Sequence, residues 1–128
     1  MALAKNLPIY SDIYKLSCDV FAMTKHFSTD TKPTLARRIE DTLLEMQDLV
    51  IETKLQESGR VALLQKLTVC YERLQFLINL SVHFKQMSYG QQAELARQML
   101  GIGKQLTGWR LSVIGKENAM GSCKSTDT

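Results

Sequence analysis

The sequence predicts an all-α protein that folds as an antiparallel up-down-up-down four-helix bundle. Apolar residues recur at spacings of three and four in four separate stretches, the pattern of helices with one buried face. Both prolines and most other helix breakers fall between these stretches, and no long run alternates in the manner of a strand. Short joints favour antiparallel neighbours, so the four helices predict a bundle.

Composition indicates one globular domain. The chain has 128 residues, 45% of them hydrophobic and 23% charged. We expect the bundle to occupy residues 1–115, with helices at about 9–27, 33–57, 60–86 and 90–114, and residues 116–128 to form a flexible C-terminal tail. No run reaches the roughly 18 apolar residues of a membrane span and no signal-peptide pattern opens the chain, so we expect a cytoplasmic protein. Cys18, Cys70 and Cys123 lack metal-ligand spacing and are expected to be free thiols.

The first two predicted helices each have one apolar face. The first places these residues inward: Ile9, Ile13, Leu16, Val20 and Phe27, with Tyr10, Tyr14 and Phe21 as an aromatic shoulder beside them. The second begins near Pro33, which suits a first helical turn. It buries Leu35, Ile39, Leu43, Met46 and Val50, and its opposite side is acidic: Asp41, Glu45, Asp48 and Glu52. This acidic row is either a solvated face or a surface that meets basic residues of a neighbouring subunit or partner.

The third predicted helix is apolar on two opposite sides. At about 100° per residue, one set shares a narrow arc and predicts a core face: Leu63, Leu67, Tyr71, Leu74, Ile78 and Ser81. A second set lies about 180° away: Ala62, Val69, Phe76, Leu80 and His83. One apolar face is enough to pack a helix within its own domain, so the second set predicts a contact with another subunit or protein. We therefore expect a closed homo-oligomer.

The fourth predicted helix follows Ser88 and Gln91, which have the spacing of a capping box. Its core face comprises Leu95, Met99, Ile102, Leu106, Trp109 and Val113. Gly101 and Gly108 lie seven apart on the side away from the core. Small residues there permit close approach of another helix or a nucleic-acid backbone, although exposed glycines are also simply tolerated.

The net charge of +3 is small, but the basic residues gather in the second half of the chain. Lys66 and Arg73 lie seven apart on the flank of the third helix, and Arg97 and Lys104 do so on the outer face of the fourth. With Arg110, these are the candidate contacts to phosphates or to a polymerase. The alternative is that they are ordinary solubilising residues.

Several short segments resemble one known family. They are Leu7-Pro8-Ile9-Tyr10, Phe21, Thr24-Lys25-His26-Phe27, Thr34-Leu35 and Ile102-Gly103-Lys104-Gln105-Leu106-Thr107-Gly108-Trp109. Over about residues 7–112 the chain resembles the accessory variability determinant proteins of diversity-generating retroelements. Their superfamily of small four-helix bundles includes proteins encoded in intervening sequences of bacterial 23S ribosomal RNA genes. Those ribosomal-insert proteins usually open with an aromatic-rich segment that this chain lacks, which favours the retroelement branch.

The resemblance implies a homopentameric barrel that binds a reverse transcriptase and nucleic acid, and supports mutagenic copying of a template RNA. The chain is only mildly basic for that family, so the resemblance argues more firmly for assembly than for strong RNA or DNA affinity. Two alternatives stay open. One is a ribosomal-insert protein, and the other is a protein–protein scaffold without nucleic-acid contact.

No pattern of an enzyme is found in the sequence. Neither His26 nor His83 follows a glutamate at the Glu-x-x-His spacing of di-iron bundles. The segment Gly101-Ile102-Gly103-Lys104 lies within a predicted helix and follows no strand, which argues against a phosphate-binding loop. We therefore expect no catalytic residues, no metal and no cofactor. His83 is interpreted as an interface or surface residue, and Trp109 as a core anchor.

Overall fold

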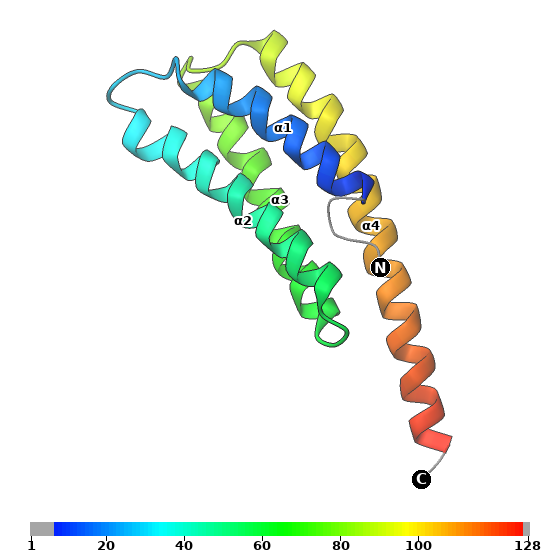
Figure 1. The fold of residues 1–128 in the computed structure, drawn as a ribbon. Coiled ribbons are helices and arrows are strands. Elements are labelled where there is room, and N and C mark those ends of the chain that lie inside the picture. The colour runs from blue at the N-terminus through cyan, green and yellow to red at the C-terminus, as the bar shows by residue number, and fades with distance from the viewer. Residues whose placement is uncertain (1–6, 127–128) are drawn as a thin grey trace.

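The protein is all-α, with four helices packed against one another in a bundle (Figure 1). The computed structural model describes the backbone of residues 7–126 and the side chains of residues 7–119. In chain order the helices are α1 (Pro8–Thr24), α2 (Arg37–Leu55), α3 (Arg60–His83) and α4 (Tyr89–Thr126), and one π-helical segment, η2 (Lys32–Ala36), precedes α2. Consecutive helices run in opposite directions, so the predicted up-down-up-down arrangement is confirmed for the single chain.

Helix α1 buries the face that its periodicity predicts. Ile9, Ile13, Leu16 and Val20 are all buried, and Pro8 occupies the first turn, where a missing N–H costs nothing. The helix ends at Thr24, three residues before the predicted end. Phe27 nevertheless remains buried, because the turn after the helix carries its side chain back to the core.

Helix α2 begins later than predicted, because the segment around Pro33 is a π-helix. The amide of Ala36 donates to the carbonyl of Thr31 at 3.2 Å, a bond that spans five residues instead of four. The helix then ends at Leu55, two residues before the predicted end, where Gln56 adopts an extended conformation. Gly59, with φ of 73°, forms the joint to α3; this left-handed conformation suits glycine.

Helix α3 ends at His83, three residues earlier than predicted. Lys85 has φ of 61°, and this left-handed residue turns the chain away from the helix axis. The side chain of Gln86 then fixes the end of the bundle. Its Oε1 accepts hydrogen bonds from the amide of Ser28 at 2.8 Å and the hydroxyl of Thr31 at 3.0 Å, joining the α1–α2 and α3–α4 connections.

Helix α4 confirms the predicted capping box. The hydroxyl of Ser88 accepts from the amide of Gln91 at 3.0 Å, and the Gln91 side chain accepts from the amide of Ser88 at 3.0 Å. The predicted end at residue 114 is wrong. The helix continues to Thr126, and its last part extends beyond the other three helices (Figure 1). A single Gly115 costs a helix only about 1 kcal/mol, too little to end it.

The core lies along the centre of the bundle and draws on every helix. Each helix adjoins two neighbours, α1 with α2 and α4, and α3 with α2 and α4. The predicted core residues of α4 are buried except Trp109, which is half-buried against the core. No helix in the described range is long and apolar enough to cross a membrane.

Candidate interaction surfaces

The second apolar set of α3 lies on the surface of the single chain, except that Leu80 is half-buried. We call it the α3 ridge: Ala62, Val69, Phe76, Leu80 and His83. Val69 is 55% exposed and Phe76 is 61% exposed, whereas Leu74, two residues before Phe76, is fully buried at 0%. The prediction that the two sets lie on opposite sides of the helix is therefore confirmed. A contact between the ridge and a second chain stays a prediction.

A second apolar surface lies between α1 and α2, where a hollow of about 350 Å³ opens to solvent. We call it the α1/α2 groove, and its lining residues are Tyr14, Ser17, Cys18, Phe21, Leu43, Leu44 and Gln47. Tyr14 is 62% exposed and Leu44 is 55% exposed. The sequence had indicated Tyr14 and Phe21 as a shoulder beside the core, but it gave no role to Leu44. The sequence pattern that could have indicated this surface is an apolar residue, Leu44, on the acidic side of α2 between Asp41 and Asp48.

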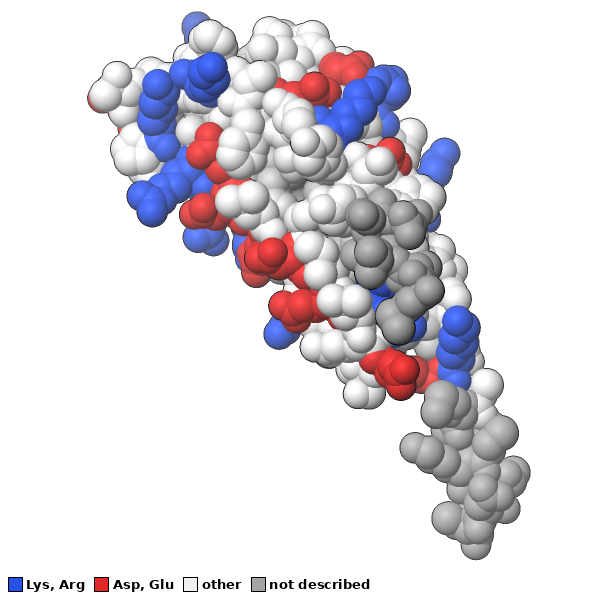
Figure 2. All heavy atoms as spheres, viewed as in Figure 1, with Lys and Arg blue, Asp and Glu red and all other residues white. Residues whose placement is uncertain are grey.

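Acidic side chains follow α2 in a row, and Figure 2 shows an uncharged strip between this row and α1. One member of the row, Glu45, is joined to α3 of the same chain: Arg73 Nη1 lies 3.0 Å from Glu45 Oε2. This hydrogen bond, more than any other cause, holds the pKa of the Glu45 carboxyl below its ordinary value. Asp41, Asp48 and Glu52 are exposed to solvent. One member of the row is thus paired within its own chain and the other three are exposed, and a contact of the row with a neighbouring subunit or partner stays a prediction.

Cys70 lies beneath this ion pair and is buried. Its burial raises the pKa of the thiol to about 11, and the neighbouring Glu45 carboxylate adds to that shift. Cys18 is instead exposed in the α1/α2 groove, and both thiols are free, as expected. Cys123 lies outside the side chains that the structure describes.

The five predicted basic residues do not gather into one patch. Arg73 is paired with Glu45, as above. Arg97 is paired with Glu94 on its own helix, with Nη2 2.6 Å from Oε1 and Nε 3.2 Å from Oε2. That bidentate bond lowers the pKa of Glu94, and the Arg97 guanidinium pKa is correspondingly raised. Lys66 is exposed on the flank of α3.

Lys104 and Arg110 line a different hollow, between α3 and α4, of about 510 Å³. We call it the α3/α4 basic groove. Its other lining residues are Thr68, Tyr71, Glu72, Leu100, Gly103, Leu106 and Thr107. The hydroxyls of the two threonines and the two cations are groups that can bind phosphate oxygens, while Glu72 opposes them electrostatically.

The glycines of α4 divide into two kinds. A Cβ built on Gly101 or Gly108 would meet nothing within 4 Å, so both positions lie in open space outside the core, as predicted. A Cβ on Gly103 would lie 2.6 Å from the hydroxyl of Tyr71, which itself donates to the carbonyl of Met99 at 2.8 Å. Gly103 therefore allows the close approach of α3 and α4, a structural role that the sequence did not predict.

Comparison with known protein families and with curated proteins finds no match for the chain. Within residues 7–119, no group of three or more histidine, cysteine or acidic side chains is arranged to hold a metal ion. The surfaces above are consequently interpreted from their own geometry and chemistry.

Proposed function

We propose that this protein is a non-enzymatic accessory subunit of a diversity-generating retroelement. It assembles with copies of itself into a closed ring, a pentamer, and binds the reverse transcriptase and template RNA to support mutagenic copying. The observation that carries the assembly is the α3 ridge, because a fully buried Leu74 and a 61% exposed Phe76 lie on one helix. The number five and the polymerase partner rest on the family resemblance in the sequence.

The ridge and the α1/α2 groove are the two surfaces that we assign to this contact. The ridge lies on the surface of α3, whereas the groove is a hollow between two other helices. A contact of one with the other joins different faces of two copies, which is the head-to-tail geometry that generates rings. Their flanking charges are complementary. Lys66 lies three residues before Val69 beside the ridge, and Asp41 and Asp48 flank Leu44 beside the groove.

Cys18 provides a direct test of this pairing, because its exposed thiol lines the groove. In the assembled protein we expect slow alkylation of Cys18, and in a Phe76→Glu variant we expect fast alkylation together with a lower mass by light scattering. Mass spectrometry of peptides identifies the labelled residue. A parent protein with the mass of one chain, 14.5 kDa, would remove the assembly proposal. Fast alkylation of Cys18 in an intact oligomer would instead remove the groove from the contact.

RNA binding is tested by its dependence on salt. Each phosphate contact that is lost lowers the slope of log affinity against log salt by about 0.7–0.9. We expect the double variant Arg97→Glu with Lys104→Glu to weaken binding and to lower that slope by about one such contact, that of Lys104, because Arg97 already holds Glu94. A control double variant, Lys25→Glu with Lys32→Glu, makes the same change in net charge at exposed positions elsewhere. Equal effects of both pairs would show that only net charge matters.

A protein–protein scaffold without nucleic-acid contact is the second candidate. It is favoured by the ion pairs of Arg73 and Arg97, because each guanidinium is already engaged within its own chain. Absence of RNA binding at low salt, alone or with the polymerase, combined with retained polymerase binding, would support the scaffold. A gene located within a ribosomal RNA operon, and not beside a reverse-transcriptase gene, would indicate the ribosomal-insert branch.

A further inference from the structure

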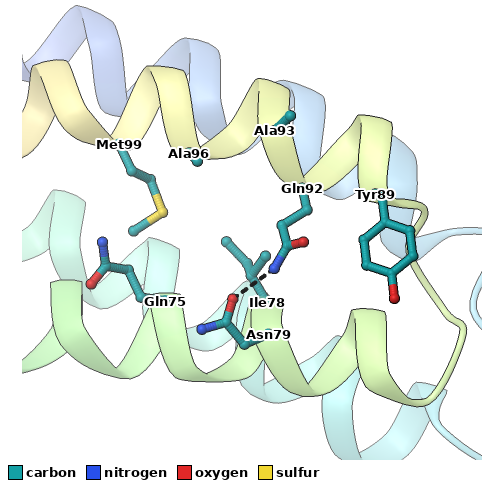
Figure 3. Close-up of a pocket in the computed structure, with 8 residues that line it drawn as sticks. All are labelled: Gln75, Ile78, Asn79, Tyr89, Gln92, Ala93, Ala96 and Met99. Atoms are coloured by element: carbon teal, nitrogen blue, oxygen red, sulfur yellow. Dashed lines mark hydrogen bonds between the residues drawn. The ribbon is translucent and has the colours of Figure 1, made fainter.

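A third hollow lies between α3 and α4, close to the connection that joins them, and has a volume of about 430 Å³ (Figure 3). Eight residues line it: Gln75, Ile78, Asn79, Tyr89, Gln92, Ala93, Ala96 and Met99. We call it the amide pocket, because three side-chain amides and no charged group are among these residues. Its volume lies in the range of about 300–1,000 Å³ that is usual for small-ligand sites.

The pocket has an apolar floor. The buried side chains of Ile78 and Met99 form it, one from each helix. Ala93 and Ala96 have short side chains on the facing side of α4, which leave the space above the floor open (Figure 3). A flat, largely apolar ring is the shape of ligand that such a slot between two helices can hold.

The amides supply directional hydrogen bonding above that floor. Gln92 Nε2 donates to Asn79 Oδ1 at 2.8 Å, which bridges α4 to α3. This bond engages neither the amide nitrogen of Asn79 nor the carbonyl oxygen of Gln92. One donor, on Asn79, and one acceptor, on Gln92, therefore remain for a ligand, and Figure 3 shows them on opposite sides of the bridge. Each can form a single hydrogen bond to a polar group on the edge of a base.

An exposed aromatic ring stands at one end of the pocket. Tyr89 is 82% exposed and lies one turn before Gln92 on α4 (Figure 3). The Ser88–Gln91 capping box fixes the backbone at this helix start, so the Tyr89 ring projects from an ordered turn beside the pocket. Tyrosine rings at such positions are stacking platforms for unpaired bases.

We propose that the amide pocket binds an unpaired nucleobase of single-stranded RNA, stacked on Tyr89 and hydrogen-bonded by Asn79 and Gln92. This inference rests on the proposed function, and it names the form of RNA that the subunit recognises. The lack of charge in the lining suits a neutral base. The phosphates on either side of that base would remain outside the pocket, within reach of exposed cations.

The test measures fluorescence anisotropy with three labelled probes of equal length: a single-stranded oligoadenylate, an abasic strand and an RNA duplex. We expect the parent protein to bind the oligoadenylate most tightly. Tyr89→Ala should weaken that binding about 5- to 100-fold and leave duplex binding unchanged, because only the unpaired base stacks. Asn79→Ala should weaken it less. Tyr89→Phe retains the ring and Gln65→Ala removes an exposed amide outside the pocket, so both should bind like the parent.

Four results would overturn the inference. Equal affinity for the abasic strand and the oligoadenylate, or no effect of Tyr89→Ala, would exclude a base in the pocket while leaving RNA binding by the subunit intact. A change of oligomer mass in Tyr89→Ala would assign the pocket to the contact between copies. No binding of any probe at low salt, alone or with the polymerase, would refute the proposed RNA function together with this inference. Circular dichroism verifies that each variant is folded.

Discussion

Phe76 offers the sharpest test of the α3 ridge as a contact surface. Its side chain is 61% exposed in the single chain. Full burial of a phenylalanine is worth about 1.5–3 kcal/mol, so covering the exposed part should stabilise each subunit contact by about 1–2 kcal/mol. This corresponds to a factor of about 5–30 in the association constant of each contact.

We expect Phe76→Glu to remove this contribution and to add the cost of taking a carboxylate out of water. The oligomer should dissociate to species of lower mass at micromolar concentration, as measured by light scattering after gel filtration. The helical circular dichroism and the urea midpoint of the dissociated chain should stay close to those of an unassembled parent chain, because the structure leaves position 76 in solvent.

Leu74→Glu is the matched control, since it places the same charge two residues away at a fully buried position. A buried carboxylate without a partner costs several kcal/mol, so this variant should lose its helical signal. The reasoning would be refuted in either of two ways. Phe76→Glu could unfold the chain, which would make the ridge part of the core. It could also leave fold, mass and polymerase binding unchanged, which would make the ridge an ordinary surface.

Three further predictions concern the single chain. Gly103→Ala should destabilise the fold by about 1–2 kcal/mol in urea titrations, because the new Cβ would lie 2.6 Å from the hydroxyl of Tyr71 on α3. Gly101→Ala is the control. Its Cβ would meet nothing, so this variant should be neutral or stabilise the chain by up to about 1 kcal/mol. Cys70 should resist alkylation at pH 8 until the protein unfolds, because burial raises the pKa of its thiol to about 11, and fast labelling of the native protein would contradict this. The lowered pKa of Glu45 stabilises the fold above the ordinary pKa of 4.5, and this contribution is lost as the pH falls through the folded-state pKa. Glu45→Gln should therefore weaken the pH dependence of unfolding in that acidic range, and an unchanged dependence would contradict the ion pair.

The sequence was sufficient to predict most residues of the inward faces but not the helix ends. Leu35 and Tyr71 were placed in the core and are only half-buried, whereas Leu64 and Leu77 are buried and were not predicted, because the buried face of α3 is broader than one narrow arc. Leu67 and Leu74 are buried as their spacing predicts, because spacing along one helix directly reports which residues share a face. Helix ends depend on weaker local preferences. Three of the predicted ends were too late by two or three residues, while Gly115 was too weak a breaker to end α4.

The surfaces built from two helices could not be predicted in the same way. Glu45 and Arg73 were assigned to separate roles, because the spacing on α2 and α3 does not reveal which flank of one helix meets the other. The same limit applies to Leu44, which matters only because α1 supplies the opposite wall of its groove. The amide pair of Asn79 and Gln92 likewise exists only once α3 and α4 are packed together.

The two proposals assign different tasks to different faces of the bundle, which makes them separable. The proposed assembly uses the α3 ridge and the α1/α2 groove, whereas the proposed RNA recognition uses the face between α3 and α4. On that face the α3/α4 basic groove and the amide pocket are neighbours, with Tyr71 lining the first and hydrogen-bonded at 3.5 Å by Gln75 of the second. A single strand that places one base in the amide pocket has Lys104 and Arg110 farther along the same face as phosphate partners. Because Arg73 and Arg97 hold carboxylates within the chain, the proposed arrangement relies on Lys104 and Arg110 for its phosphate contacts, a small number that suits a chain of small net charge.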